Sequence, residues 1–309
     1  MSLYLKYRPT EFDKIVGNEE MLQSISNLIK KKNHPHSFLL TGGTGCGKTT
    51  IARIIAKELQ AKDSDINEIN SSDFRGIDTI RNLINQCQYK PLESPCRVWI
   101  LDEVHKLTND AQNAMLKILE DTPQHIYFIL CTTEPEKLLK TIVGRCSTFQ
   151  VKNLDDRQMY KLLKRTVIQE EEKLEKEIYD QIIQDAMGHP RNALQILEQV
   201  LNVEPENRLE VAKKKAAEYS KSIELCRELI KRTSWNKVSE ILRGLKGNEE
   251  PESIRRVVIG YASSILLNGK SDVILGLILE EFKKPFYDTG FPGLVLACYS
   301  VVVSELNEN

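Results

Sequence analysis

One glycine-rich octapeptide constrains the fold of this 309-residue chain more than any other feature. It reads Gly42-Gly43-Thr44-Gly45-Cys46-Gly47-Lys48-Thr49 and matches the pattern G-x-x-x-x-G-K-[ST]. In such a loop the backbone N–H groups point at phosphate oxygens, the lysine faces the β- and γ-phosphates, and the threonine hydroxyl can bind Mg²⁺. A bare turn between a strand and a helix would not require lysine followed by threonine. The octapeptide and the adjoining Thr50 therefore predict a site for ATP with Mg²⁺.

The surroundings of the octapeptide predict an α/β fold. Short apolar or alternating runs typical of strands lie at 37–41, 66–70, 97–101 and 126–131, and segments with helical periodicity lie between them at 48–60, 77–88 and 109–120. Strands that alternate with helices favour a parallel sheet covered on both faces. After about residue 153 the strand signals vanish and amphipathic helical segments follow. We therefore expect an ATPase core at 1–152, a small helical domain at 153–206 and an all-helical domain at 207–309.

A second acidic motif completes the expected site. Asp102 and Glu103 follow the apolar run that ends at Leu101, and Asp102 lies 54 residues after Lys48. In P-loop ATPases an aspartate at such a strand end holds the Mg²⁺ shell and a neighbouring glutamate polarises the attacking water. An acidic pair alone is weak support, but it gains weight behind a complete P-loop. His105, two residues further on, is expected to be structural.

Composition limits the classes of partner and the compartment. Lysine and arginine number 43 against 44 acidic residues, so the net charge of -1 gives no general attraction to a polyanion, and nucleic-acid binding requires a local patch. The seven cysteines form no C-x-x-C pair, which disfavours zinc and a disulfide framework. The N-terminus shows no apolar signal core, and the apolar runs at 257–267 and 293–303 are shorter than a membrane span. We expect a cytoplasmic protein, either at the nucleoid or in a phage-infected bacterium, with no membrane partner.

With their flanking segments, these motifs resemble the clamp-loader ATPases of the AAA+ superfamily. The likeness runs in order over roughly residues 1–200 and rests on Leu5-Lys6-Tyr7-Arg8-Pro9, Val16-Gly17-Asn18-Glu19, Asn70-Ser71-Ser72-Asp73-Phe74-Arg75-Gly76-Ile77-Asp78, Asp102-Glu103-Val104-His105 and Gly144-Arg145-Cys146. Some of these strings resemble the bacterial gamma/tau subunit and others the small subunits of replication factor C. The resemblance implies that residues 153–206 form a lid and residues 207–309 a collar that holds an oligomer together.

The resemblance also assigns roles to residues that lie outside the two motifs. It places Arg8 near the nucleotide, Thr133 as the first sensor of the γ-phosphate, and Arg191 as a second sensor that reaches from the lid. Arg145 matches the arginine that stabilises transition-state charge on ATP held by a neighbouring subunit. Gly144 stands where the family has serine, and we expect this departure to alter the helix start that aims Arg145.

For nucleic acid and clamp, the resemblance implies contacts made by a spiral of subunits. Arg75 and Arg81, with Lys106 as a weaker third, are the residues expected to contact DNA phosphates without reading bases. A basic residue at the position of Arg75 is also expected to restrain Glu103 until DNA arrives. Gln88 and Tyr89 fall in the region expected to face the sliding clamp.

The function predicted is therefore an ATPase subunit of a DNA polymerase clamp loader. Its expected partners are other clamp-loader subunits in an assembly of five, the sliding clamp and primer-template DNA. Two alternatives stay open. One is another AAA+ DNA-remodelling ATPase, such as an initiator or a branch-migration motor, although no winged-helix pattern follows residue 208. The other is a non-hydrolysing structural subunit, against which the intact Lys48, Thr49, Asp102 and Glu103 argue.

Overall fold

The computed structural model describes residues 1–31, 34–247, 249–267 and 272–303. The chain divides into two compact units, Met1–Pro205 and Glu206–Asn309. The boundary between them lies close to the expected start of the third domain at residue 207. The further division of the first unit into a core and a lid stays a prediction.

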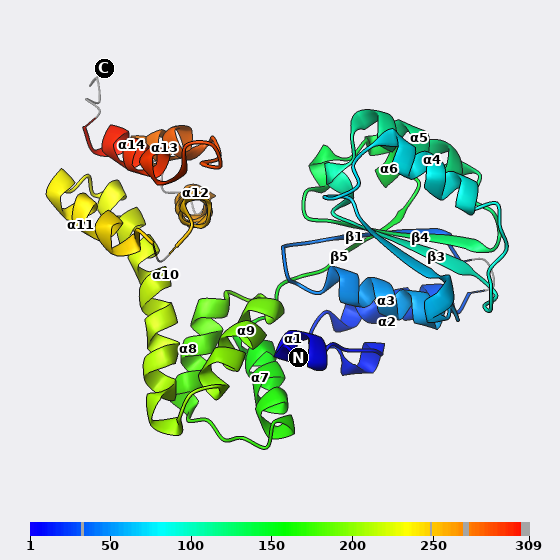
Figure 1. The fold of residues 1–309 in the computed structure, drawn as a ribbon, viewed down its shortest axis with the longest axis horizontal. Helices are drawn as coiled ribbons and strands as arrows, with labels where there is room; N and C mark the ends of the chain where they lie inside the picture. The colour runs from blue at the N-terminus through cyan, green and yellow to red at the C-terminus, as the bar shows by residue number, and fades with distance from the viewer. Residues whose placement is uncertain (32–33, 248, 268–271, 304–309) are drawn as a thin grey trace. The chain divides into compact units, whose positions relative to one another are not determined.

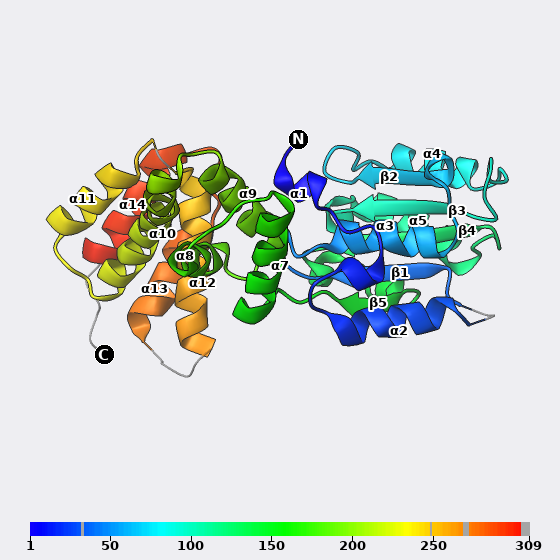
Figure 2. The same ribbon diagram turned by 90° about the horizontal axis from the view of Figure 1, so that it is seen from below.

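The first unit is built on one five-stranded parallel sheet. Its strands are β1 (Ser37–Thr41), β2 (Ile66–Asn70), β3 (Arg97–Asp102), β4 (Ile126–Thr132) and β5 (Ser147–Gln150). They lie in the order β2-β3-β4-β1-β5 (Figure 2). Every residue of β1 and β4 is buried, which explains why these strands read as continuous apolar runs. The α/β class is confirmed, and β5 is an element that the sequence analysis missed.

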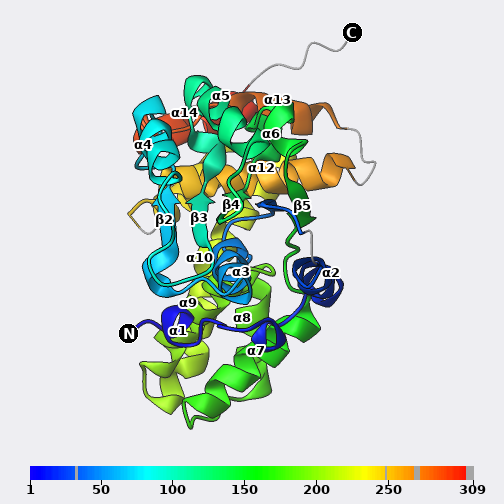
Figure 3. The same cartoon turned by 90° about the vertical axis from the view of Figure 1, so that its right-hand side faces the viewer.

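Helices cover both faces of this sheet. The helices of the α/β part are α1 (Leu3–Lys6), α2 (Glu19–Ile29), α3 (Lys48–Glu58), α4 (Ile77–Gln86), α5 (Asn109–Glu120) and α6 (Lys140–Val143). Figure 1 shows α2 and α3 on one face and α4, α5 and α6 on the other. Two separate apolar cores result: one includes Ile51 and Ile55 of α3, and the other includes Ile80 of α4 and Met115 of α5. Viewed along the strands in Figure 3, α3 crosses the middle of the sheet and α2 lies toward β5.

Three helices follow the sheet within the first unit. They are α7 (Asp156–Gln169), α8 (Lys176–Ala186) and α9 (Pro190–Leu201). A capping box fixes the start of α7, because the Asp155 side chain accepts the Gln158 backbone N–H while the Gln158 side chain accepts the Asp155 N–H. Pro190 occupies the first turn of α9, where its missing N–H costs no hydrogen bond. The short helix α1 packs against α9, and the Ser2 hydroxyl donates to Glu198 at 2.6 Å. The N-terminal segment therefore joins these helices to the α/β part.

The second unit is helical throughout its described residues. Its helices are α10 (Arg208–Ile230), α11 (Trp235–Leu245), α12 (Pro251–Leu267), α13 (Val273–Phe282) and α14 (Gly290–Val303). They share one apolar core that includes Leu229, Val258 and Phe282. Among the helices that the structure describes, none has both the length and the apolarity needed to cross a membrane.

Candidate active site

The glycine-rich loop joins β1 to α3 in a backbone shape that requires glycine. Gly42, Gly45 and Gly47 have φ values of 148°, 72° and 108°, a region that residues with a Cβ rarely adopt. At Gly42 an added Cβ would lie 2.3 Å from the carbonyl oxygen of Val151, so the chain has no room for alanine there. Gly47 directly precedes the first residue of α3, which places the start of that helix at the loop. The loop thus has the open backbone that phosphate binding needs.

Lys48 lies inside this loop. Its ammonium donates to the carbonyl oxygens of Gly42 at 2.9 Å and Gly43 at 2.8 Å, and the residue is only 6% exposed. Two short hydrogen bonds to the same loop offset much of the cost of burying the charge. The cation is therefore held beside the loop N–H groups before any nucleotide arrives.

Thr49 and Asp102 meet between α3 and the end of β3. The Thr49 hydroxyl donates to Oδ2 of Asp102 at 2.7 Å, and the backbone N–H of Glu103 donates to Oδ1 of the same carboxylate at 3.0 Å. The Thr49 hydroxyl and the Asp102 carboxylate supply hard oxygen ligands of the kind that Mg²⁺ prefers, and they lie next to each other. The residues predicted to hold the metal therefore lie together and fit that ion.

Glu103 follows with a left-handed backbone, φ 51°, which is uncommon for a residue with a side chain. The Thr133 hydroxyl donates to its Oε2 at 3.3 Å. The same Oε2 lies 3.4 Å from Nε2 of His105 in the short helix η3 (Val104–Lys106). The predicted first sensor and the predicted water-polarising group are thus in direct contact.

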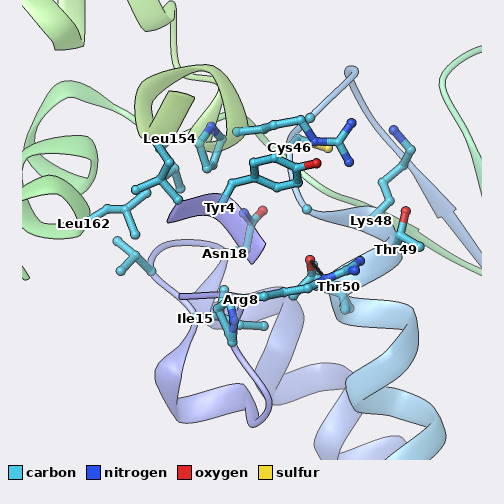
Figure 4. A pocket seen from close by; sticks show the side chains of 18 of the residues that line it. Tyr4, Arg8, Ile15, Asn18, Cys46, Lys48, Thr49, Thr50, Leu154 and Leu162 are labelled. Carbon is cyan, nitrogen blue, oxygen red and sulfur yellow. Dashed lines mark hydrogen bonds between the residues drawn. The ribbon is translucent and has the colours of Figure 1, made fainter. Parts of the chain in front are cut away.

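A cavity beside the loop collects most of the predicted nucleotide-binding residues. It is lined by Arg8, Thr44 to Thr50, Asp102, Glu103 and Arg191 (Figure 4). Arg8 donates from Nε to the Thr50 hydroxyl at 3.0 Å. Arg191 reaches the loop from α9, because a Cβ added at Gly45 would lie 3.4 Å from that of Arg191. The structure brings together residues that stand up to 183 positions apart in the sequence.

Several lining residues were missed by the sequence analysis. They are Tyr4, Ile15, Asn18, Leu154, Leu162, Pro190 and Leu194. The Tyr4 ring lies 5.7 Å from the guanidinium carbon of Arg191, within the range of a cation–π contact. Asn18 belongs to the string Val16-Gly17-Asn18-Glu19, but the others carry no local motif and meet only where the N-terminal segment, α7 and α9 pack around the loop. Their mixture of aromatic and aliphatic side chains suits the flat face of a nucleotide base.

Arg145 does not line this cavity. It follows the end of α6, where its Nη1 donates to the Thr141 carbonyl at 3.0 Å and its Nη2 pairs with Glu120 at 3.1 Å. Gly144 closes the C-terminal end of α6 in a right-handed conformation, so the expectation that it alters a helix start was wrong. A Cβ at Gly144 would lie 3.4 Å from the Lys140 carbonyl, an ordinary contact, so serine and glycine both fit there.

The residues predicted to contact DNA and clamp also lie outside the cavity. Arg75 donates to the Ser72 carbonyl at 2.9 Å and Arg81 pairs with Asp78 at 3.2 Å, while Lys106 is exposed. The Glu103 carboxylate contacts Thr133 and His105, and its expected restraint by Arg75 stays a prediction.

Gln88 and Tyr89 are exposed to solvent on a loop that polar contacts fix. The buried carboxylate of Asp65 accepts the backbone N–H groups of residues 92, 93 and 94, and Arg97 donates to the carbonyls of Gln86 and Lys90. Tyr89 is 68% exposed on this loop. The loop that carries this exposed ring is therefore fixed by polar contacts on both sides of Tyr89.

Comparison of the sequence with known proteins finds two family models and a set of related replication proteins. The family model for the delta subunit of DNA polymerase III matches residues 60–155, and that for Zeta toxin matches residues 19–83, which include the loop. The gamma/tau subunit of DNA polymerase III from Mycobacterium tuberculosis is 35% identical over 224 residues, covering 65% of this chain and 39% of that protein. The gamma subunit from Buchnera aphidicola is 32% identical over 219 residues, covering 64% and 61%. The chain thus spans less than two thirds of the length of these relatives.

Solved structures give the fold. The Thermotoga maritima RuvB Holliday junction branch migration motor superposes with a TM-score of 0.59 and 20% identity, covering 72% of this chain and 79% of that one. A variant of the same motor gives a TM-score of 0.61 at 18% identity, covering 72% and 80%. At this identity the likeness speaks for the fold alone.

The five-stranded parallel sheet, the P-loop and the helices beyond them define an α/β P-loop protein whose fold is similar to that of the RuvB motor. The sequence likeness is more specific: over 64–65% of its length the chain is 32–35% identical to gamma, tau and gamma/tau subunits of DNA polymerase III. The predicted resemblance to the bacterial gamma/tau subunit is confirmed, and the resemblance to replication factor C stays a prediction.

Proposed function

We propose that this chain is an ATP-hydrolysing subunit of a DNA polymerase clamp loader, which opens a sliding clamp and places it on primer-template DNA. The observation that carries the proposal is the joined site, in which Thr49 contacts Asp102 at 2.7 Å beside a buried Lys48 and an adjacent Glu103. A purely structural subunit would not need to keep this set together. The likeness to gamma/tau subunits supports the clamp-loader role.

The chain's residues divide the work of hydrolysis between them. Thr49 and Asp102 would hold Mg²⁺, which supplies positive charge to the phosphates when bound. Lys48 and the loop N–H groups orient the β- and γ-phosphates, and Glu103 polarises a water that attacks the γ-phosphorus. The bond between the γ-phosphorus and the bridging oxygen breaks, and ADP and phosphate leave. Thr133, through its bond to Glu103, can report the presence of the γ-phosphate.

A neighbouring subunit would complete the site. Arg145 lies away from the cavity of its own chain and is partly exposed, with 32% of its side-chain surface accessible. An arginine in this position can stabilise the transition state only on ATP held by another subunit. We therefore propose an oligomer, with the second unit as its collar and the cytoplasm as its location.

The DNA and clamp surfaces are proposed from exposed side chains. Arg75, Arg81 and Lys106 lie near the start of α4 and on η3, where they would contact phosphates in a sequence-independent way. Gln88 and Tyr89 would meet the clamp, because Tyr89 is an exposed aromatic residue on a loop fixed from within.

The direct test is ATP turnover by the chain assembled with its partner subunits. We expect turnover to rise when a bacterial sliding clamp and a primed single strand are added together, and to vanish in Lys48→Ala. A four-way DNA junction serves as the competing ligand. Stimulation by the junction and not by clamp with primed DNA would favour the branch-migration alternative and contradict the proposal.

A further inference from the structure

A buried histidine stands directly behind the proposed water-polarising glutamate. Only 3% of the His105 side-chain surface is exposed. Its Nδ1 lies 3.0 Å from the Thr132 hydroxyl oxygen, and its Nε2 lies 3.1 Å from Oε1 of Glu134 and 3.4 Å from Oε2 of Glu103. Every polar atom of this imidazole therefore has a polar neighbour.

The neighbours fix which ring nitrogen carries the proton. Ionised carboxylates only accept hydrogen bonds, so Nε2, which faces two of them, must be the donor. Burial lowers the pKa of His105, and the nearby Glu103 and Glu134 only partly offset that effect, which favours the neutral ring. In the neutral ring Nδ1 is then an acceptor and takes the Thr132 O–H. The same Thr132 oxygen accepts the Glu134 backbone N–H at 3.1 Å, so the network closes without a conflict of roles.

One N–H thus faces two carboxylates with different tasks. Glu103 belongs to the proposed hydrolytic site, whereas Glu134 also pairs with Lys137 at the surface. In this structure Nε2 lies closer to Glu134 than to Glu103. Among the described residues, the Glu103 carboxylate is held by Thr133 at 3.3 Å and by this longer contact, so its direction depends on where the imidazole N–H points.

We propose that His105 is a positioning residue for ATP hydrolysis: its Nε2–H orients the Glu103 carboxylate, and Glu134 competes with Glu103 for that single donor. The inference rests on the proposed function, because it concerns hydrolysis at Glu103. It also revises the expectation that His105 is merely structural.

The test uses two amide variants, each of which places a polar atom near one of the two imidazole nitrogens. In His105→Gln the amide nitrogen reaches the place of Nε2 and keeps a donor toward Glu103, whereas His105→Asn reaches only the place of Nδ1. We expect His105→Asn to lower kcat by about tenfold or more, since misdirecting a catalytic group by a fraction of an ångström is costly. KM for ATP should stay within about twofold because the P-loop is untouched, and His105→Gln should retain most of kcat. Equal losses in both variants, or a loss carried by KM, would overturn the proposal.

The proposed competition between Glu134 and Glu103 predicts a separate effect on kcat. Glu134→Gln weakens the competing acceptor, so basal kcat should rise by about two- to tenfold, the worth of one hydrogen bond. The same change in a His105→Asn background should have no effect, because the donor is gone. An undiminished effect of Glu134→Gln in that background would mean that Glu134 acts by another route.

Two controls separate this inference from the proposed function. If the wild-type chain turns over ATP no faster than Lys48→Ala, the proposed function fails; if wild type is active and His105→Asn matches His105→Gln, only the inference fails. Imidazole nitrogen NMR of the wild-type chain, assigned by loss of signals in His105→Gln, is independent of activity. We expect a protonated Nε2 and a bare Nδ1 at pH 7.5, and a neutral ring protonated at Nδ1 would overturn the proposal.

Discussion

At the residue scale, the site is a set of polar side chains that already satisfy one another. Lys48 is bonded to the carbonyls of its own loop, Thr49 to Asp102, and Thr133 to Glu103. Buried polar groups without such partners would destabilise the fold by about 1–3 kcal/mol each. The functional side chains are therefore held in place by the same hydrogen bonds that satisfy them.

The assignment of Glu103 leads to a prediction at this scale. Glu103→Gln removes the charge that polarises water but leaves Lys48, Thr49 and Asp102 to hold Mg-ATP. We expect ATP affinity to stay near that of wild type while turnover falls by about 10²–10⁴-fold. Rapid-quench turnover and equilibrium binding of labelled ATP measure the two quantities. Glu136→Gln, an exposed carboxylate just beyond β4, is the matched control. Turnover of Glu103→Gln within a few-fold of the control would show that the assignment is wrong.

At the element scale, the parts that sequence predicts well are those with a local signal. The four predicted strands occur at 37–41, 66–70, 97–102 and 126–132, within a residue of their expected ends. The P-loop could be found because glycine, lysine and threonine act at fixed spacing. β5 could not, because Ser147–Gln150 is a half-buried edge strand of four residues with only one large apolar side chain. Tyr4, Leu162 and Leu194 could not either, since the packing of α1, α7 and α9 alone brings them to the cavity.

The helix α8 carries a buried acid whose titration affects stability. Asp185 on α8 is 8% exposed, its Oδ2 has no hydrogen-bond partner among the residues that the structure describes, and burial raises the pKa of its carboxyl from 3.8 to about 6. A raised folded pKa favours the neutral form, so the contribution to stability is full below pH 3.8 and is lost as the pH rises through about 6.

Asp185→Asn should therefore stabilise the first unit at neutral and alkaline pH. The amide keeps the shape and carries no charge, so we expect a gain of about 1–3 kcal/mol at pH 8 that shrinks toward pH 5. Urea unfolding at the two pH values measures it. Asp180→Asn, on an exposed position of the same helix, should change stability by no more than about 0.5 kcal/mol. A gain for Asp185→Asn that is the same at both pH values would contradict the role of burial.

At the scale of the whole molecule, the two parts of the proposed site lie apart in one chain. Lys48, Thr49, Asp102 and Glu103 line one cavity, whereas Arg145 lies outside it and is held by Glu120 and the Thr141 carbonyl. That ion pair is largely exposed, and such pairs contribute about 0–1 kcal/mol, so Arg145 can leave it at little cost. The central claim is that ATP is hydrolysed where the cavity of one subunit meets Arg145 of the next.

The measurement that tests this claim most directly is complementation between two inactive variants. Lys48→Ala removes the buried cation of the P-loop but keeps Arg145. Arg145→Ala keeps the cavity intact but lacks the arginine that would act on a neighbour's ATP. Native mass spectrometry first establishes that mixed oligomers form, with partner subunits present where assembly needs them. Each variant alone should show little turnover, and the confirmed mixture should recover a measurable part of the wild-type rate. A mixture whose rate is only the sum of the two residual rates would contradict the account, because Arg145 would then not act on a neighbour's ATP.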